Sequence, residues 1–438
     1  MQLKVKKHEL RLLLQCIPIL TFATLASLGS LLPSVVQFSA AVILAGQVVF
    51  IFGTKGIKKN IGLLWIPLMI FFYVRNNPNI KFYSLTYIQV LLLFVCCILF
   101  SALGGFNDRC WMKKMVSSWR YLYFIYIAFT IYMFLDSSAI NFVCNLFPDA
   151  ASTILNQYHN AGIPGLTKHY STNGMLLAVG TMIFGSYALT EKRRSDYLLF
   201  LISVAALLLS GKRAHTVFGL TALYLCYFAY NSNAKKSRLV KGIGVLLGAL
   251  TVFAVASYCV PALATVVFRF IPTLGEESAA ITDAMRMREI QFGTKTGDMS
   301  VGRVDVWLKA FSMFGNHSLV GIGWGQYVNQ GGWFWNIHNI YIQLLVETGI
   351  IGFIIYCGWF LFHLVRTWSI YSKMRVNPED YTNIDYCLMN FSLAMQIFFI
   401  LYGFTGNPLY DREMFVPYFI ACAISVNYAN NDDGSELE

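Results

Sequence analysis

The chain has 438 residues, of which 57% are hydrophobic and 13% charged, and its mean hydropathy is +0.56. The charged fraction is about half of that in a soluble domain, which excludes an ordinary soluble globular protein. The net charge of +11 comes mostly from short loops between apolar runs, so it does not indicate a nucleic-acid partner.

Apolar runs recur along the whole chain, each long enough to cross a hydrocarbon core about 30 Å thick. We therefore predict an all-α, polytopic membrane protein with about twelve transmembrane helices. The basic N-terminus leads straight into a full-length run, so no cleavable signal peptide is expected. The predicted spans are 12–30, 34–53, 61–75, 82–103, 119–136, 172–190, 196–210, 214–230, 240–260, 349–366, 388–404 and 414–429.

These spans divide the chain into three predicted regions. Residues 1–260 hold transmembrane helices 1–9, and residues 349–438 hold helices 10–12 and a short acidic cytoplasmic tail. Residues 261–348 form a large extracytoplasmic loop, in which 278–292 and 303–314 are predicted to be short amphipathic helices.

The positions of lysine and arginine predict the orientation. Alternate loops, such as 55–59, 109–114 and 192–194, carry most of the basic residues and should be cytoplasmic, together with both termini. The other set of loops should face outward. It includes the large loop 261–348 and a second long loop, 137–171, with a Pro/Gly turn at 162–165.

Charged side chains are rare inside the predicted spans. Ion-coupled transporters carry charged residues at mid-membrane, so their scarcity argues against that class. Most of the ten cysteines lie in apolar spans, and no Cys or His spacing is typical of a metal site. We expect no metal and no cofactor.

Two cations interrupt the apolar pattern at the outer end of a span. Lys212 and Arg213 follow Ser210-Gly211 at the start of the next predicted helix, where the helix dipole is already positive. Such a start is a natural diphosphate site. The alternative is that both side chains extend to lipid headgroups.

Two further arginines lie on the predicted outer side. Arg303 precedes Trp307 by one helical turn, which fits a phosphate clamp beside a sugar-stacking ring as well as an ordinary surface pair. Arg412 precedes the last span and is either a further phosphate contact or a local partner of Asp411. Lys168-His169 is a weaker candidate.

Histidine 338 is the candidate base. Residues 336–352 predict one helix that runs into the membrane. One stripe of this helix holds His338, Ile342, Leu345, Gly349 and Gly352. The glycines should allow close packing on a neighbouring helix, with the imidazole at the top of the seam as a general base. Glu347 falls on the opposite side and is predicted to lie outside the site.

Three sequence blocks resemble the O-antigen polymerase and O-antigen ligase family of bacterial envelope enzymes. The most specific block is IHNIYIQLLVETGIIG (337–352), in which His-Asn, nine residues and Gly-x-x-Gly follow the pattern of the family. The weaker blocks are LLLSGKRAHTVFGL (207–220) and VGRVDVWLKAF (301–311) with VGIGWGQY (320–327).

The resemblance implies a membrane glycosyltransferase of the GT-C-like kind in the bacterial cytoplasmic (inner) membrane, with an outward-facing active site. Donor and acceptor would be glycans on undecaprenyl diphosphate. His338 matches the position that activates or positions the acceptor hydroxyl, and Arg213 and Arg303 match positions that stabilise the diphosphate. Lys212 and Arg412 are added as candidate diphosphate contacts because of their location. Trp307, Asn339 and Tyr341 are weak candidates for sugar contacts. His215 departs from the small or aromatic residue usual in the family.

Several functions remain open at this stage. We favour a polymerase of O-antigen or capsular polysaccharide, and an O-antigen ligase that transfers polymer to lipid A core is the alternative. Protein-directed oligosaccharide transfer is a smaller possibility. A flippase or exporter of lipid-linked glycan is an alternative of another class, and a structural scaffold is a third. Expected partners are membrane lipids, a chain-length regulator and a flippase.

Overall fold

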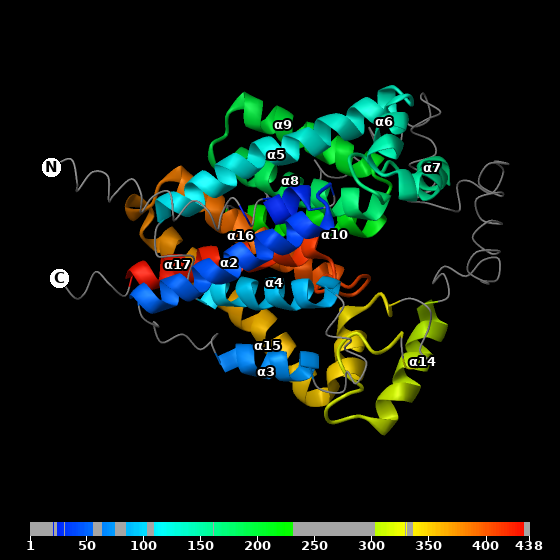
Figure 1. Ribbon diagram of the computed structural model, residues 1–438. Coiled ribbons are helices and arrows are strands. Elements are labelled where there is room, and N and C mark those ends of the chain that lie inside the picture. The colour runs from blue at the N-terminus through cyan, green and yellow to red at the C-terminus, as the bar shows by residue number, and fades with distance from the viewer. Residues whose placement is uncertain are drawn as a thin grey trace. The chain divides into compact units, whose positions relative to one another are not determined.

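The computed structural model describes residues 21, 24–29, 31–55, 64–74, 85–102, 109–160, 162–230, 303–328, 330 and 336–432 (Figure 1). Every regular element among these residues is a helix, which confirms the all-α class. They form two compact units. The first comprises residues 1–123, 186–192 and 307–438, and the second comprises 124–185 and 193–306.

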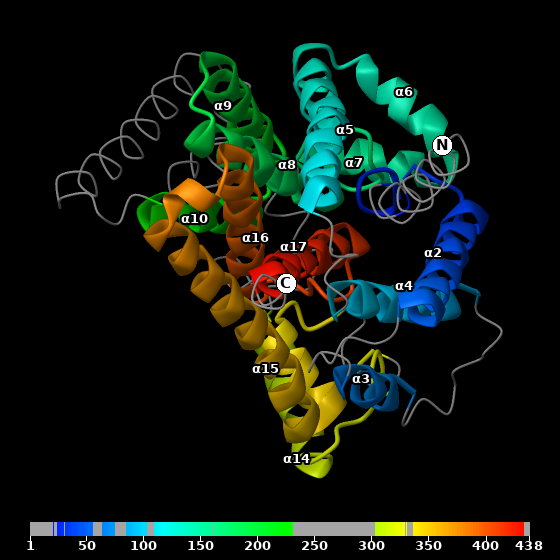
Figure 2. The ribbon, with the colours of Figure 1, turned by 90° about the vertical axis from the view of Figure 1, so that its left-hand side faces the viewer.

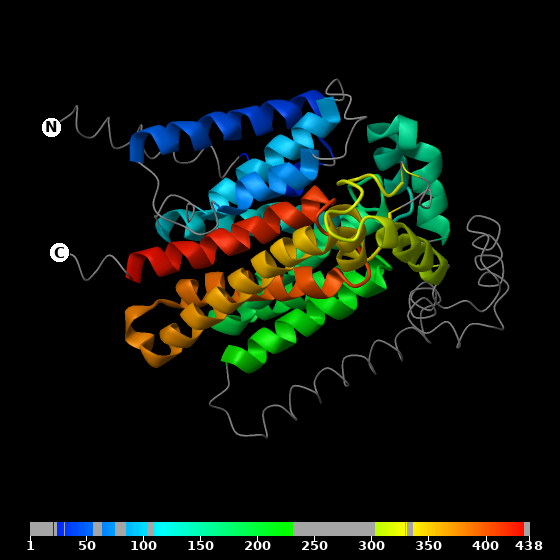
Figure 3. The ribbon, with the colours of Figure 1, turned by 90° about the horizontal axis from the view of Figure 1, so that it is seen from below.

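The first unit is built around three long helices near the C-terminus. They are α15 (Ile340–Val376), α16 (Asn383–Tyr402) and α17 (Arg412–Asp432), which lie side by side (Figure 3). The N-terminal elements that belong with them are η1 (Thr24–Leu28), α2 (Ser34–Lys55), α3 (Trp65–Val74) and α4 (Leu85–Ala102). Helix α3 packs on α15, with the Trp65 and Trp359 ring centroids 5.7 Å apart (Figure 2).

The second unit holds most of the middle of the chain. Its helices are α6 (Ala139–Leu146), η4 (Pro148–Ala150), α7 (Ala151–Asn160), α9 (Arg194–Leu209) and α10 (Arg213–Tyr230). The residues of α5 (Arg109–Leu135), α8 (Tyr170–Thr190) and α14 (Arg303–Asn316) are divided between the two units. Within this unit α9 packs on α10, and α6 packs on α7.

Three helices in the described part of the chain are long and apolar enough to cross a membrane, namely α8, α15 and α16. Most other predicted spans with described residues also coincide with helices, but the count of twelve stays a prediction. The predicted span 240–260 and the predicted helix 278–292 lie outside the described residues, as does most of span 12–30.

Two local predictions were incomplete. Helix α5 begins ten residues before the predicted span, because its first turns are too polar to register as membrane-spanning. The predicted outer loop 137–171 contains α6 and α7, which are too short to stand out by hydropathy. The predicted helix 303–314 is confirmed by α14.

The prediction of one continuous helix over 336–352 is wrong at two places. The helix begins at Ile340, because the side chain of Asn339 accepts the N–H groups of Tyr341 and Ile342 at 3.1 and 3.2 Å and so caps it. It is also broken at Gly349, whose φ of 68° and ψ of −173° are not helical. His338 therefore precedes the helix and does not share a helical stripe with the two glycines.

Candidate active site

The Lys212–Arg213 turn adopts the geometry that its sequence predicts. Gly211 has a φ of 71°, a left-handed conformation that favours glycine, and α10 begins at Arg213. The side chains of Lys212 and Arg213 are half-buried. The two cations thus lie at the positive end of α10, where backbone N–H groups and the helix dipole favour an anion.

Neighbouring segments of the same unit pack tightly against this turn. A Cβ on Gly162 would lie 2.0 Å from the carbonyl oxygen of Ser210, so the predicted 162–165 turn contacts it backbone to backbone. The Lys212 ammonium lies 5.3 Å from the centroid of the Tyr170 ring, and that ring stacks on His169 at 4.9 Å. The turn is therefore held in one place by aromatic and glycine contacts.

Helix α14 carries the Arg303–Trp307 pair. It begins at Arg303, and both side chains are half-buried. The indole Nε1 of Trp307 donates to the carbonyl oxygen of Ile337 at 3.1 Å. Trp307, predicted as a sugar contact, is thus tethered to the residue directly before His338.

His338 is exposed and has a φ of 53°, which is uncommon for a residue with a side chain. The backbone on its C-terminal side is fixed by the Asn339 cap and by the N–H of Ile340, which donates to the carbonyl oxygen of Gly403 at 2.9 Å. An exposed imidazole on a held backbone is suited to meet a substrate hydroxyl.

The other two candidate sugar contacts have structural partners. Asn339 is only 8% exposed and uses its side-chain oxygen as the helix cap. Tyr341 is half-buried, and its hydroxyl donates to the carbonyl oxygen of Ile400 at 2.7 Å. Their assignment to sugar binding stays a prediction.

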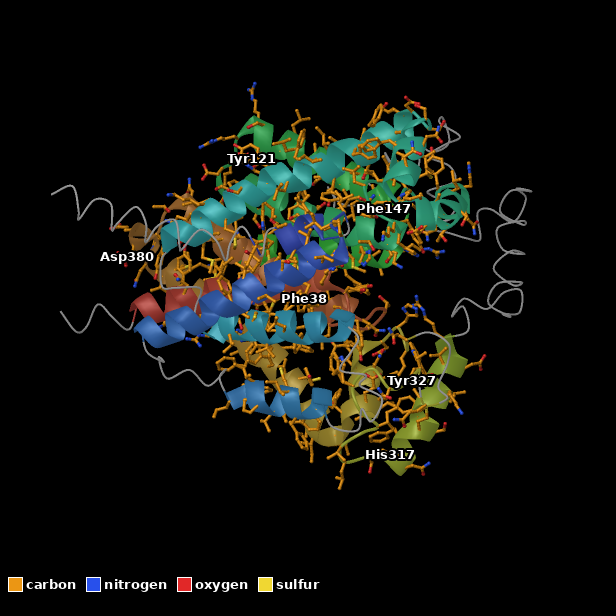
Figure 4. The ribbon with its side chains drawn as sticks, viewed as in Figure 1. Phe38, Tyr121, Phe147, His317, Tyr327 and Asp380 are labelled. Carbon is orange, nitrogen blue, oxygen red and sulfur yellow. The ribbon has the colours of Figure 1, made fainter. Side chains whose placement is uncertain are left out.

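Aromatic residues of the 317–330 segment face inward. Tyr327 is fully buried (Figure 4). Trp324 is 3% exposed, and its ring stacks on Tyr410 and Tyr356 at centroid distances of 4.9 and 5.5 Å. These two rings hold the segment in place and do not offer an open face to a sugar.

Arg412 begins α17 and has partners within its own unit. Its guanidinium donates to Gln37 and, at 3.3 Å, to the carboxylate of Glu413. The local ion pair described for Arg412 therefore involves Glu413, the residue after it. The side chain keeps 30% exposure, and its role at the diphosphate stays a prediction.

The sequence analysis did not single out Gln343 and predicted that Glu347 lies outside the site. Gln343 and Glu347 are 0% and 1% exposed, and they bond the segments around His338 and Tyr327. Two polar residues four positions apart on an otherwise apolar turn were the signal that could have found them.

Comparison with known proteins identifies the region that carries these residues. Residues 198–357 match a family described as O-antigen ligase. Over this region the chain is similar to the O-antigen ligase family. No curated protein matches the chain. The match confirms the resemblance to the O-antigen polymerase and ligase family drawn from the three sequence blocks.

The matched region, residues 198–357, contains Lys212, Arg213, Arg303, Trp307 and His338. The structure brings Trp307 to the peptide before His338, and Lys212 to Tyr170. The convergence of both arginines with His338 stays a prediction. Similarity to this family indicates glycosyltransferase-type activity on lipid-linked glycans in a membrane.

Proposed function

We propose that the protein is a polymerase that joins undecaprenyl-diphosphate-linked repeat units into O-antigen or capsular polysaccharide. The observation that carries this proposal is the exposed His338 on a backbone held on both sides, within the region that matches the O-antigen ligase family. The Ser-Gly-Lys-Arg turn favours a polymerase over a ligase, because it resembles polymerases of the family more closely.

In the proposed reaction, a hydroxyl of the acceptor glycan attacks the anomeric carbon of the donor. His338 accepts the proton of that hydroxyl as the new glycosidic bond forms. The bond between the anomeric carbon and the diphosphate oxygen breaks, and undecaprenyl diphosphate leaves with the electron pair. Arg213 and Arg303, with Lys212 and Arg412, stabilise the charge that develops on the diphosphate. No metal or cofactor is part of this scheme.

The proposal places this chemistry at the outer face of the bacterial inner membrane. Twelve spans in a GT-C-like arrangement, with 261–348 as the outer loop and both termini in the cytoplasm, would anchor the lipid carrier there. A chain-length regulator and a flippase are the proposed protein partners.

Deletion of the gene followed by a glycan gel separates the polymerase from the ligase. Loss of a polymerase leaves single repeat units on the lipid A core. Loss of a ligase leaves polymer on the lipid carrier, and this result would replace the proposed reaction with ligation. Unchanged glycans would refute both the polymerase and the ligase function.

Charge reversal tests the diphosphate assignment separately. Arg213→Glu should abolish turnover and weaken binding of the lipid-linked donor, because it puts a negative charge beside the diphosphate. Arg193→Glu, at the other end of the preceding helix, is the matched control and should bind donor normally. Undiminished donor binding by Arg213→Glu would remove the assignment.

A further inference from the structure

The peptide before His338 is held by a buried amide on the first turn of α15. The Oε1 atom of Gln343 accepts the N–H of Ile337 at 3.3 Å, and its Nε2 donates to Oδ1 of Asn336 at 3.3 Å. Gln343 is 0% exposed, so no water competes for these contacts. The Gln343 amide thus hydrogen-bonds both Asn336 and Ile337, the two residues that precede the histidine.

A buried carboxylate fixes which way this amide points. The Oε1 atom of Glu347, one turn further along α15, accepts both the Nε2 of Gln343 and the N–H of Tyr327 at 3.2 Å. Its other oxygen accepts the N–H of Gly325 at 2.9 Å and the hydroxyl of Tyr410. The backbone N–H groups of Gly325 and Tyr327 can only donate to Glu347, and that of Ile337 can only donate to Gln343. Gln343 therefore directs its NH₂ group to Glu347 and its oxygen to Ile337.

The backbone of His338 needs such support. A non-glycine residue with a φ of 53° costs about 1–3 kcal/mol and persists only where its surroundings determine it. Gln343 accepts the N–H of Ile337, and the indole of Trp307 donates to the carbonyl oxygen of Ile337. Glu347 also joins this peptide to the 317–330 segment and to Tyr410.

We propose that Gln343, oriented by Glu347, is a positioning residue that holds His338 in the conformation needed for glycosyl transfer. The transfer role of His338 is that of the proposed function, on which this inference rests. Gln343 acts through the backbone and does not touch the substrate.

The test replaces Gln343 with methionine, which keeps the length of the side chain and removes both hydrogen-bonding groups. Gln396→Met is the matched control, because Gln396 is also 0% exposed in the same unit and bonds Thr367 and Ser392 at 2.8 and 3.2 Å. Hydrogen exchange of peptides that cover 336–342 is measured on both variants in detergent. Gln343→Met should accelerate this exchange about tenfold or more, since the hydrogen bond to the N–H of Ile337 is lost, and Gln396→Met should not. Equal exchange in both variants would overturn the inference.

Glycosyl transfer by the purified full-length variants provides the second readout. Gln343→Met should lower kcat by about 10- to 100-fold and leave the KM for the lipid-linked donor within about twofold, because misplacement of a reacting group affects the chemical step. In a His338→Ala background the same change should cause no further loss. A normal kcat, or losses that multiply in the double variant, would overturn the inference.

A second variant and a separate readout distinguish a folding defect, a failed inference and a failed proposed function. If Gln343→Met does not fold, Asn336→Ala is used instead, because it removes one hydrogen-bond partner of Gln343 at a half-buried position. It should accelerate exchange and lower kcat, both by less than Gln343→Met would. An unchanged exchange and kcat in Asn336→Ala would then overturn the inference. Full turnover by His338→Ala would refute the proposed function of the histidine, whereas the exchange experiment separately decides whether Gln343 holds the peptide.

Discussion

Replacing Gly349 with alanine should destabilise the protein, because two backbones cross at this glycine. A Cβ on Gly349 would lie 2.3 Å from the carbonyl carbon and oxygen of Leu319. On the opposite side, a Cβ on Gly321 would lie 2.3 Å from the carbonyl of Glu347. Two hydrogen bonds lock the crossing, from the N–H groups of Ile350 and Ile351 to the 318–319 carbonyls at 2.9 and 3.2 Å.

The cost of Gly349→Ala has two parts. A φ of 68° with a ψ of −173° is a conformation that essentially only glycine adopts, and an alanine there costs about 1–3 kcal/mol. Forcing the methyl group against a backbone that cannot rotate away adds about 1–3 kcal/mol. The total of about 2–6 kcal/mol is large beside the net stability of about 5–15 kcal/mol typical of folded domains.

Thermal unfolding in detergent measures the effect, with Gly315→Ala as the matched control. A Cβ on Gly315 meets no atom within 4 Å, and this glycine lies in helix α14, where alanine is favoured by about 0.5–1 kcal/mol. We expect a clear fall in the midpoint for Gly349→Ala and no fall for Gly315→Ala. Equal midpoints for the wild type and Gly349→Ala would refute the crossing.

Three further predictions concern single candidate residues and the contacts around them. Trp307→Phe should slow transfer by up to about tenfold, since it removes one hydrogen bond of about 0.5–1.5 kcal/mol to Ile337, and an unchanged rate in steady-state assays would contradict this. Gly162→Ala should lower the yield of folded protein in membranes, because its methyl group would overlap the Ser210 carbonyl; normal yield would show that the turn can move. A cysteine at Lys212 should react with an impermeant thiol reagent added outside intact cells, and labelling only after lysis would overturn the proposed orientation.

The helices were predictable because a long apolar run has few alternatives to a helix in a membrane. The run at 388–404 became α16, and the run at 172–190 became α8. Short amphipathic helices such as α6 and α7 were missed, because their burial depends on contacts that hydropathy does not record.

The candidate residues were predictable as positions, but not as a geometry. The cation-bearing turn follows from Ser210-Gly211, since a glycine after a helix favours the left-handed conformation that Gly211 adopts. The left-handed backbone at His338 carries no comparable signal, because histidine adopts this conformation far less often than glycine does. Helical periodicity placed Glu347 opposite His338, but the helix begins only after its cap at Asn339, so that periodicity does not reach the histidine. In the structure Glu347 bonds Gln343, which in turn bonds the peptide before His338.

The most direct test of the central claim is the rate at which purified protein joins undecaprenyl-diphosphate-linked repeat units, compared between His338→Ala and His317→Ala. Both histidines are exposed in the same unit, and His317 lies at the end of α14 (Figure 4). We predict that His338→Ala lowers the rate by about 100-fold or more, as expected for the loss of a general base, whereas His317→Ala keeps the wild-type rate. A wild-type rate for His338→Ala, at equal folded protein, would contradict the account.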